Sequence, residues 1–448
     1  MFPAWSEIAE VAKGRLFNFL WIGLFLRLLI APFVGHPYDS RVFMSVGWSV
    51  GHGLTPYGQY TLQDIFSNPS HPHLHGTFYG IGYPPPWGII CGLMYMISHA
   101  FSSSIYAYNF ALKIPIILGD LATSFLVYKI LKRRLGVRGA SKAYFAYLFC
   151  PYLILVGVVW GMFDVLAFFF SLLSAYWLQE KRALSISCLS ISCALKLIPL
   201  VLIPLYSIFI QKSTGSWRKA GFYFFSALCL VTVFTLVPMI AFNWPLSNLY
   251  HALFPQLSAT DIGPYGQTSF TYGCASPFNV LNLIRLSNPT FTVPSFLNYL
   301  WVPACVLVYL HAAQAHTKVD LASVLRWSLL TMLVFFTTRS WVSDQNLLFL
   351  FSFLMLTTLM ESHCWRTIHA LWVSLSIFVL VHVPAIAFLW IPNPWTLDVA
   401  TAFCDGPFGP IRLFAMSGLT LGWLGLSWHF VLKKTRWRKG EDSYFVAS

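Results

Sequence analysis

The residues best suited to chemistry in this sequence are charged side chains that lie just outside long hydrophobic segments. Asp39 follows the apolar run 16–35 and is flanked by Tyr38 and Arg41. If that run crosses a bilayer, the Asp39 carboxylate lies at its far mouth, where it could accept a proton from a hydroxyl nucleophile. A turn or a helix cap is the alternative explanation for an isolated aspartate in a loop.

Three later positions repeat this arrangement. Asp164 lies between two apolar runs with almost no loop, and Lys196 lies between two short apolar stretches, just before Pro199. Arg339 and the pair Asp344-Gln345 lie at the mouth of another span. A cation at such a place can bind a phosphate or an anionic head group. The alternatives are a helix N-cap for Asp164 and snorkelling to the interface for Lys196.

Other polar segments are less specific. The run His71-Pro72-His73-Leu74-His75 could bind a metal ion, although solvated histidines are the alternative, and the loop Gln267–Asn279, which includes Tyr272, is suited to sugars. A disulfide between Cys274 and Cys404 is an alternative if both lie in outer loops. The sequence has no CxxC or Cys/His metal spacing and no Walker, GxGxxG, GxSxG or HExxH motif. These absences argue against nucleotide-driven transport, Rossmann cofactors and zincin chemistry. No cofactor is predicted, and a divalent metal stays an alternative.

The composition identifies the environment in which these residues work. Of 448 residues, 57% are hydrophobic and only 10% are charged, whereas a soluble globular protein has roughly 25% charged residues. The net charge of +13 comes from short basic clusters between apolar runs, which is typical of cytoplasmic loops in membrane proteins. We therefore interpret the positive charge as a sign of which loops are cytoplasmic, and we predict no nucleic-acid partner.

The bilayer-length rule gives thirteen candidate spans. They are residues 16–35, 84–101, 107–131, 140–160, 163–179, 183–196, 197–211, 219–242, 295–314, 321–338, 345–360, 367–390 and 410–432. If Asp39 lies outside and Lys132 inside, the chain crosses the bilayer an odd number of times between them, although two candidate spans lie there. One of the two therefore does not cross, and 84–101 is the weaker candidate. We expect about twelve crossings (11–13), with both termini inside.

This topology predicts an all-α polytopic protein with its polar candidates on the external side. Val42, Phe43, Val46 and Val50 recur at helical spacing, which predicts an amphipathic helix lying in the interface. We divide the chain into an N-terminal transmembrane module, 1–242, with an external loop at 36–82, and a C-terminal module, 243–448, with an external loop at 243–294.

Several short motifs follow one another in a familiar order. After Asp39 come Gly53-Leu54-Thr55-Pro56-Tyr57, Tyr83-Pro84-Pro85-Pro86 and Gly119-Asp120-Leu121, and then Gly161-Met162-Phe163-Asp164 and Leu195-Lys196-Leu197-Ile198-Pro199. This series resembles the GT-C superfamily of polyprenyl-phosphate-sugar-dependent glycosyltransferases over roughly residues 20–210. It is most similar to the first mannosyltransferase of GPI-anchor synthesis and to prokaryotic polyprenol-phosphate-mannose-dependent enzymes. Where the GPI enzyme has two aspartates one residue apart, this chain has only Asp39.

The resemblance implies inverting transfer of a hexose, mannose first, from a polyprenyl phosphate to a lipid-linked or glycan acceptor on the non-cytoplasmic face. Asp39 would be the base. Lys196, Arg339 and Arg41 would bind the donor phosphate and lipid. The expected acceptor or sugar contacts are Asp164, Tyr57, Tyr83, Asp344, Gln345 and Tyr272.

Two alternatives remain open from the sequence. The first is a transporter or flippase of a lipid-linked or anionic solute, because transporters also place polar residues at helix breaks. The second is a related enzyme that uses glucose or arabinose. The membrane would be the cell membrane in a prokaryote and the endoplasmic reticulum in a eukaryote.

Overall fold

The computed structural model describes residues 15–58, 60–61, 77–78, 80–253, 273–288, 291, 295–316, 319–361 and 364–434. The described chain is predominantly helical. Five helices are long and apolar enough to cross a bilayer, and five further apolar helices have 10–17 residues. The protein is therefore an integral membrane protein, as the composition predicted, while twelve crossings stay a prediction.

The N-terminal half contains most of the helices that carry the predicted motifs. Its elements are α2 (Arg15–Ile30), α3 (Asp39–Gly51), β1 (Tyr60–Thr61), β2 (Thr77–Phe78), α5 (Pro85–Phe101), α6 (Ile105–Leu148), α7 (Pro151–Ile154), η2 (Leu155–Trp160), α8 (Asp164–Trp177), α9 (Arg182–Leu195), η3 (Ile198–Val201), α10 (Leu202–Thr214) and α11 (Trp217–Ala241). Strand β1 pairs antiparallel with β2.

The C-terminal half continues the bundle. Its elements are α12 (Leu246–Leu253), β3 (Gly273–Cys274), η5 (Pro277–Asn279), α13 (Val280–Ser287), η6 (Ser295–Tyr299), α14 (Trp301–Gln314), α15 (Leu321–Thr338), β4 (Trp341–Val342), η7 (Asp344–Asn346), α16 (Leu347–Glu361), α17 (Trp365–His382), η8 (Ala385–Leu389), α18 (Thr396–Asp405) and α19 (Gly409–Lys434). Strand β3 pairs parallel with β4.

Helix α6 spans 44 residues but is interrupted at Gly136, whose φ of 65° and ψ of 179° are not helical. A left-handed φ is accessible to glycine because it has no Cβ. The interruption lies between the predicted spans 107–131 and 140–160, just after the basic cluster Lys132–Arg134. One continuous apolar core includes buried residues from 1–242 and from 243–448, so the two predicted modules share a core and their separation stays a prediction.

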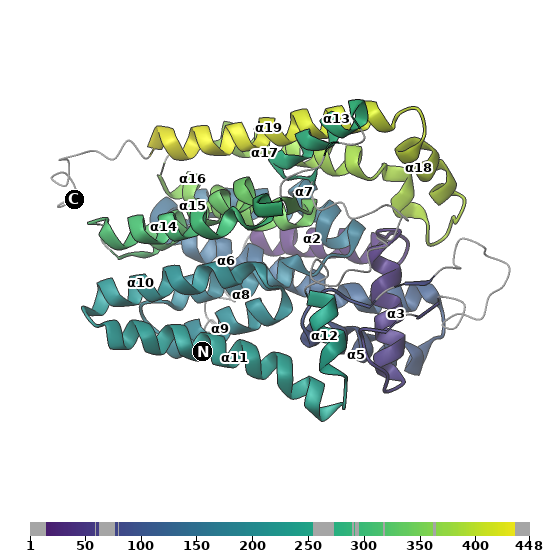
Figure 1. Cartoon of the computed structure of the whole chain (residues 1–448), viewed down its shortest axis with the longest axis horizontal. Helices are drawn as coiled ribbons and strands as arrows, with labels where there is room; N and C mark the ends of the chain where they lie inside the picture. Colours follow the sequence, from purple (N-terminus) through teal and green to yellow (C-terminus); the bar gives the residue numbers. More distant parts are fainter. Residues whose placement is uncertain are drawn as a thin grey trace.

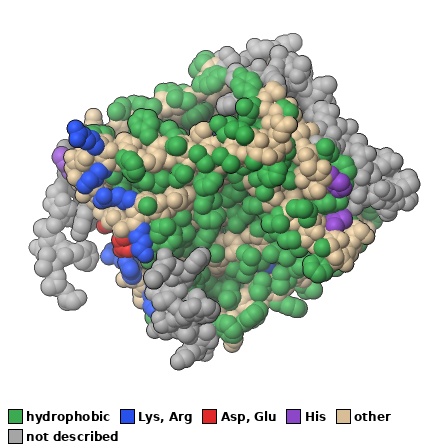
Figure 2. Space-filling view, turned by 90° about the horizontal axis from the view of Figure 1, so that it is seen from below, with side chains coloured by type: hydrophobic (Ala, Val, Ile, Leu, Met, Phe, Trp, Pro, Cys, Tyr) green, Lys and Arg blue, Asp and Glu red, His purple; other side chains and the backbone are tan. Residues whose placement is uncertain are grey.

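The two ends of the bundle differ in charge. Figure 1 shows α10, α11, α14 and α19 running along the long axis of the molecule, with α3 lying across that direction at one end. Lys212 and Lys219 lie near the turn between α10 and α11, and Lys181 lies between α8 and α9. Figure 2 shows Lys and Arg gathered at one end of the visible face, with apolar side chains across its middle. Asp164 is the first residue of α8, and Lys196 directly follows α9. Both therefore lie at the end of these two helices that is opposite to Lys181.

Helix α3 differs from its prediction in one respect. It begins at Asp39 as a separate short helix, but its residues from Ser40 to Gly47 are buried. It packs along α5 and contacts Tyr108 of α6, whose hydroxyl donates to the Met44 carbonyl at 2.9 Å. Polar and apolar faces of α3 are therefore both covered by the protein, and its placement in the membrane interface stays a prediction.

A buried ion pair holds the first span. Arg27 Nη2 of α2 lies 2.6 Å from Asp120 Oδ2 of α6, and the same nitrogen also lies 2.6 Å from the Leu148 carbonyl oxygen. Lys113, on the same helix as Asp120, donates to the Val34 carbonyl. This contact ties the end of the first hydrophobic segment to α6, just before the segment that carries Asp39.

Candidate active site

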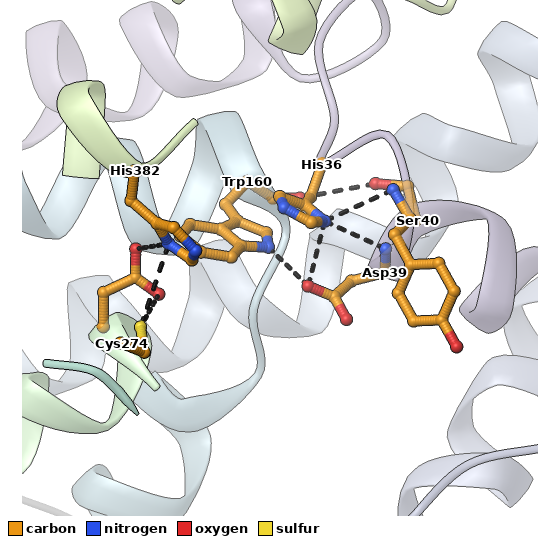
Figure 3. Close-up of polar contacts among 8 residues, drawn as sticks. His36, Asp39, Ser40, Trp160, Cys274 and His382 are labelled. Atoms are coloured by element: carbon orange, nitrogen blue, oxygen red, sulfur yellow. Dashed lines mark hydrogen bonds and ion pairs between the residues drawn. The ribbon is translucent and has the colours of Figure 1, made fainter. Parts of the chain in front are cut away.

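Asp39 is fixed through one oxygen of its carboxylate. The indole Nε1 of Trp160 donates to Asp39 Oδ2 at 2.7 Å, and the His36 ring stacks on the Trp160 ring at 4.3 Å. Figure 3 shows Trp160 and His36 beside Asp39, with no dashed line to the other carboxylate oxygen. Among the described residues, no hydrogen bond to Asp39 Oδ1 is found, and the side chain is 21% exposed. One oxygen is held and the other is open.

His36 has two roles that compete for one nitrogen. Its Nδ1 lies 3.0 Å from the backbone nitrogen of Asp39 and also 3.0 Å from Asp39 Oδ2. If Nδ1 accepts the backbone N–H, it carries no proton and cannot donate to the carboxylate; which tautomer is present is inferred from such contacts. Tyr38 N also approaches Nδ1, at 3.3 Å, so two backbone N–H groups and the Asp39 carboxylate lie around the same nitrogen. The Trp160 indole donates to Asp39 whichever contact Nδ1 makes.

The local fold explains how Trp160 reaches Asp39. Trp160 ends η2, a π-helix, and the next residue, Gly161, has a left-handed φ of 94°. Single π-helical turns occur often at functional sites. The Trp160 carbonyl accepts from His36 N at 2.9 Å, so backbone and side chain both join this turn to the segment before α3. A side chain at Gly161 would be strained and would meet Lys113 Cε at 3.3 Å.

Electrostatics favour the ionised form of Asp39. Burial acts to raise the pKa of Asp39, but His36, the hydrogen bond from Trp160 and the charge of Lys196 outweigh it, so the pKa lies below its usual 3.8. The pKa of Tyr83 is raised by burial and by the negative charges of Asp39 and Asp164. Tyr83 therefore keeps its proton and remains a hydrogen-bond donor beside an ionised Asp39.

Asp164 and Lys196 form a buried ion pair. Lys196 Nζ contacts Asp164 Oδ1 at 2.5 Å, and the ammonium lies 5.4 Å from the centre of the Tyr83 ring and 5.7 Å from that of Phe163. Neither alternative from the sequence is observed: Asp164 makes no capping hydrogen bond for α8, and Lys196 is only 4% exposed. Asp164 Oδ2 has no hydrogen-bond partner within the part of the chain that the structure describes.

Asp344 belongs to a third group of titratable side chains. His382 Nδ1 lies 2.9 Å from Asp344 Oδ2, and Cys274 Sγ lies 3.9 Å from Asp344 Oδ1 and 3.9 Å from the same His382 nitrogen. Burial raises the pKa of the Cys274 thiol, and the adjacent His382 acts in the opposite direction. The His382 ring lies 6.4 Å from that of Trp160, and Figure 3 shows His382 and Asp39 on either side of the indole.

The remaining predicted residues are distributed around these groups. Arg339 ends α15, where its guanidinium lies 5.2 Å from the centre of the Phe335 ring and close enough to Lys196 for their charges to interact. No carboxylate of the described residues forms an ion pair with Arg339. The Arg41 guanidinium lies 4.8 Å from the centre of the Trp390 ring. The Tyr57 hydroxyl donates to the Tyr83 carbonyl at 3.0 Å.

Gln345 is buried, and its Oε1 has no partner among the described residues. Tyr272 and the His71, His73 and His75 run lie outside the described residues. The disulfide between Cys274 and Cys404 that the sequence left as an alternative is not formed.

Sequence reasoning missed His36, Trp160 and His382, and it considered Cys274 only for a disulfide. His36 and Asp39 are three residues apart, a spacing that places two side chains together at a helix start. Trp160 directly precedes the Gly161 turn motif that the sequence did identify. His382 carried no such signal, since its contact with Asp344 joins residues 38 positions apart.

Comparisons with known proteins found a similarity among solved structures. No family model matches the chain. No curated protein matches it either. The chain is similar to the crystal structure of ArnT from Cupriavidus metallidurans bound to undecaprenyl phosphate, at 13% identity and a TM-score of 0.45. The match covers 94% of this chain and 78% of that chain.

Proposed function

We propose that this protein is a membrane glycosyltransferase that moves a hexose, with mannose as the first candidate, from a polyprenyl phosphate to a lipid-linked or glycan acceptor. The observation that supports this proposal best is the Asp39 carboxylate. One of its oxygens is held by Trp160, the other has no described partner, and its pKa favours the ionised form. An ionised carboxylate with one open oxygen can accept the proton of an acceptor hydroxyl.

The reaction would be a single inverting displacement. Asp39 Oδ1 takes the proton of the acceptor hydroxyl as that oxygen forms a bond to the anomeric carbon of the sugar. The bond between the anomeric carbon and the phosphate oxygen breaks, and the polyprenyl phosphate leaves with the electron pair. The products are the glycosylated acceptor, the lipid phosphate and a protonated Asp39, which returns its proton to solvent.

Two cations are available to the leaving phosphate. Arg339 is half-buried and forms no ion pair with a described carboxylate, so its planar guanidinium can offer two parallel donors to phosphate oxygens. Lys196 is already paired with Asp164. Its positive charge therefore acts on Asp39 and on the phosphate from a distance, without a direct contact. We therefore assign the direct phosphate contact to Arg339 and give Lys196 a positioning role, which changes the emphasis of the expectation from sequence.

The test is a transfer assay with matched lipid donors. Proteoliposomes that contain the full-length protein would receive radiolabelled mannose, glucose or arabinose on a polyprenyl phosphate, with membrane extract as the acceptor source. We expect mannose to enter the acceptor fraction with the wild type and not with Asp39→Asn. Asp398→Asn, which changes an exposed aspartate of α18, is the matched control and should retain transfer.

Two results would contradict the proposal. If no labelled sugar reaches any acceptor while labelled donor lipid moves between leaflets, the protein is a flippase, the alternative left open by the sequence. If Asp39→Asn retains wild-type transfer, Asp39 is not the base. The assay thus separates the reaction class from the residue assignment.

The proposal also places the active site on the non-cytoplasmic side. The basic turns at Lys181 and Lys212 lie at the other end of the bundle from Asp164 and Lys196, and such turns are usually cytoplasmic. A cysteine at the exposed position Ser247, in a background lacking exposed Cys229, should react with an impermeant maleimide from the external side of intact cells or from the lumenal side of microsomes. Reaction only from the cytoplasmic side would invert this topology.

A further inference from the structure

The cluster of Cys274, Asp344 and His382 has a geometry that the proposed transfer reaction does not use. One ligand atom from each of these residues lies within 4.8 Å of the others. Cys274 and Asp344 are buried, and the His382 side chain is 26% exposed. The three residues come from β3, η7 and the last position of α17, so the cluster joins three separate segments of the C-terminal half.

The contacts distinguish a metal site from a nucleophilic cysteine site. In a nucleophile–histidine–acid relay, the nucleophile and the acid contact different nitrogens of the imidazole. Here Cys274 Sγ and Asp344 Oδ2 both approach the same nitrogen, His382 Nδ1, at 3.9 and 2.9 Å. Three ligand atoms that converge on one point are the arrangement needed around a cation.

The distances agree with a tetrahedral cation of the zinc type. Zinc–sulfur and zinc–nitrogen bonds of about 2.3 and 2.0 Å with tetrahedral angles place ligand atoms about 3.3–3.6 Å apart. His382 Nδ1 lies 2.9 Å from Asp344 Oδ2 and 3.9 Å from Cys274 Sγ, and each distance differs from these values by only a few tenths of an ångström. The 3.9 Å contact between Sγ and Asp344 is made by the other oxygen, Oδ1, and one ligand atom from each residue lies within 4.8 Å of the others. A thiolate, an imidazole and a carboxylate together favour Zn²⁺ over Mg²⁺ or Ca²⁺, which prefer oxygen ligands alone.

The backbone holds this set in place. Cys274 has a left-handed φ of 55°, a strained conformation for a residue with a side chain. It is kept there by pairing of β3 with β4 and by the hydrogen bond from Ala275 N to the Val342 carbonyl at 2.8 Å. The Asp344 carbonyl accepts from the Tyr152 hydroxyl at 2.7 Å, and Arg412 donates to the His382 carbonyl at 2.9 Å.

We propose that Cys274, Asp344 and His382 form a binding site for Zn²⁺ or a similar thiophilic divalent cation, with its fourth position open. On binding, the Cys274 thiol loses its proton to solvent, and Sγ, Nδ1 and one Asp344 oxygen become ligands without any change of oxidation state. The site would lie beside Trp160, the residue that holds Asp39, and it goes beyond the proposed transfer reaction because its existence does not depend on a sugar donor.

Cobalt titration of the purified full-length protein tests this directly. After removal of metal by a chelator, Co²⁺ should bind once per chain with a thiolate-to-cobalt charge-transfer band in the near ultraviolet, and Zn²⁺ should displace it. Cys274→Ser should remove that band. His382→Gln should weaken Co²⁺ binding by more than about tenfold, because even the outer partners of metal ligands contribute about 10–100-fold.

Matched controls exist on the same elements. His369 is an exposed histidine of the same helix as His382, and Cys364 directly precedes that helix; His369→Gln and Cys364→Ser should leave the band unchanged. Cobalt bound at the His71–His75 run would give no thiolate band, so the band distinguishes binding at Cys274 from binding at those histidines. A wild type without the band at saturating Co²⁺ would overturn the proposal, and so would a band that survives Cys274→Ser. If Cys274→Ser cannot be purified, wild-type affinity retained in His382→Gln would overturn it as well.

Discussion

Two aspartate–histidine pairs lie on either side of Trp160, and they differ in what they leave free. In the pair His36–Asp39, the carboxylate is partly exposed, one oxygen is held by the indole, and the other has no described partner. In the pair Asp344–His382, the carboxylate is 1% exposed and both oxygens have contacts. The same two residue types thus give one group suited to accept a proton and one suited to hold a fixed ligand.

The two pairs differ in the groups that lie near Nδ1 of each histidine. A sulfur atom approaches His382 Nδ1, whereas backbone N–H groups approach His36 Nδ1. Backbone donors fix the ring of His36 and leave the open oxygen of Asp39 to a substrate. This comparison assigns base chemistry to the Asp39 side of the indole and ligand binding to the Asp344 side.

The largest expected effect comes from removing the base. Asp39→Asn keeps the size of the side chain but cannot accept a proton, so transfer should fall by about 10²–10⁴-fold, measured as kcat with a labelled donor. Asp344→Asn should reduce transfer by less, on the order of tenfold, because it changes a binding contact beside Trp160 and leaves the base in place. If Asp164→Asn abolishes transfer in a folded protein while Asp39→Asn does not, the base has been assigned to the wrong carboxylate.

The next effect concerns stability. Lys196→Ala should lower the free energy of unfolding by about 3–5 kcal/mol, because it leaves Asp164 charged and unpaired in a buried place. Thermal unfolding in detergent would measure this loss. The double variant Asp164→Asn with Lys196→Met removes both charges and should recover most of it. Equal losses in the single and double variants would show that the loss does not come from leaving Asp164 charged and unpaired.

Loss of the free cation should affect donor binding. Arg339→Gln should raise the apparent KM for the lipid donor by about tenfold, equivalent to about 1.4 kcal/mol, with kcat changed less. Arg326→Gln is the matched control, because Arg326 lies on the same helix but pairs with Glu361 at 2.6 Å. Unchanged donor kinetics in Arg339→Gln would return the phosphate contact to Lys196 or Arg41.

The smallest effect is a shift in pH dependence. Asp39 has a lowered pKa, so its ionised form persists at neutral pH, and transfer should be lost only as the pH falls through that pKa. Trp160→Phe removes a hydrogen bond to the charged form, which raises the pKa of Asp39. The acidic limb of the kcat/KM profile should move upward by about one unit, or about 1.4 kcal/mol. A downward shift would show that the indole does not stabilise the carboxylate.

Helix class and membrane character could be predicted from the sequence because both follow from local composition. The break near Lys132 and the start of a helix at Asp39 also depend on nearby residues. The exact spans were harder, since α8, α9 and α10 have only 13–14 residues each and length alone does not establish whether such a helix crosses the bilayer.

The partners of the site residues could not be predicted. Asp164 and Lys196 were placed at one end of the bundle, but their pairing joins residues 32 positions apart and depends on both being buried. Cys274 lies near Asp344 because β3 pairs with β4, two residues before Asp344, and His382 approaches both from the end of α17. Such contacts depend on how segments pack, and a single sequence carries no periodic signal for them.

The π-helix before Gly161 makes the position of Trp160 depend on chain length rather than on side-chain chemistry. A π-turn contains one residue more than an α-turn, and each residue of a helix advances the side chains by about 100° around its axis. If residues 155–160 kept their number but adopted α-helical geometry, the extra residue would turn the indole to another face. Asp39 would then lose its donor and His36 its stacking partner, although every residue around the site would remain. Deleting one residue within 155–159 removes the extra residue, so an α-helical segment of that length should keep the direction of the indole, whereas the same deletion in a regular α-helix would turn every side chain beyond it.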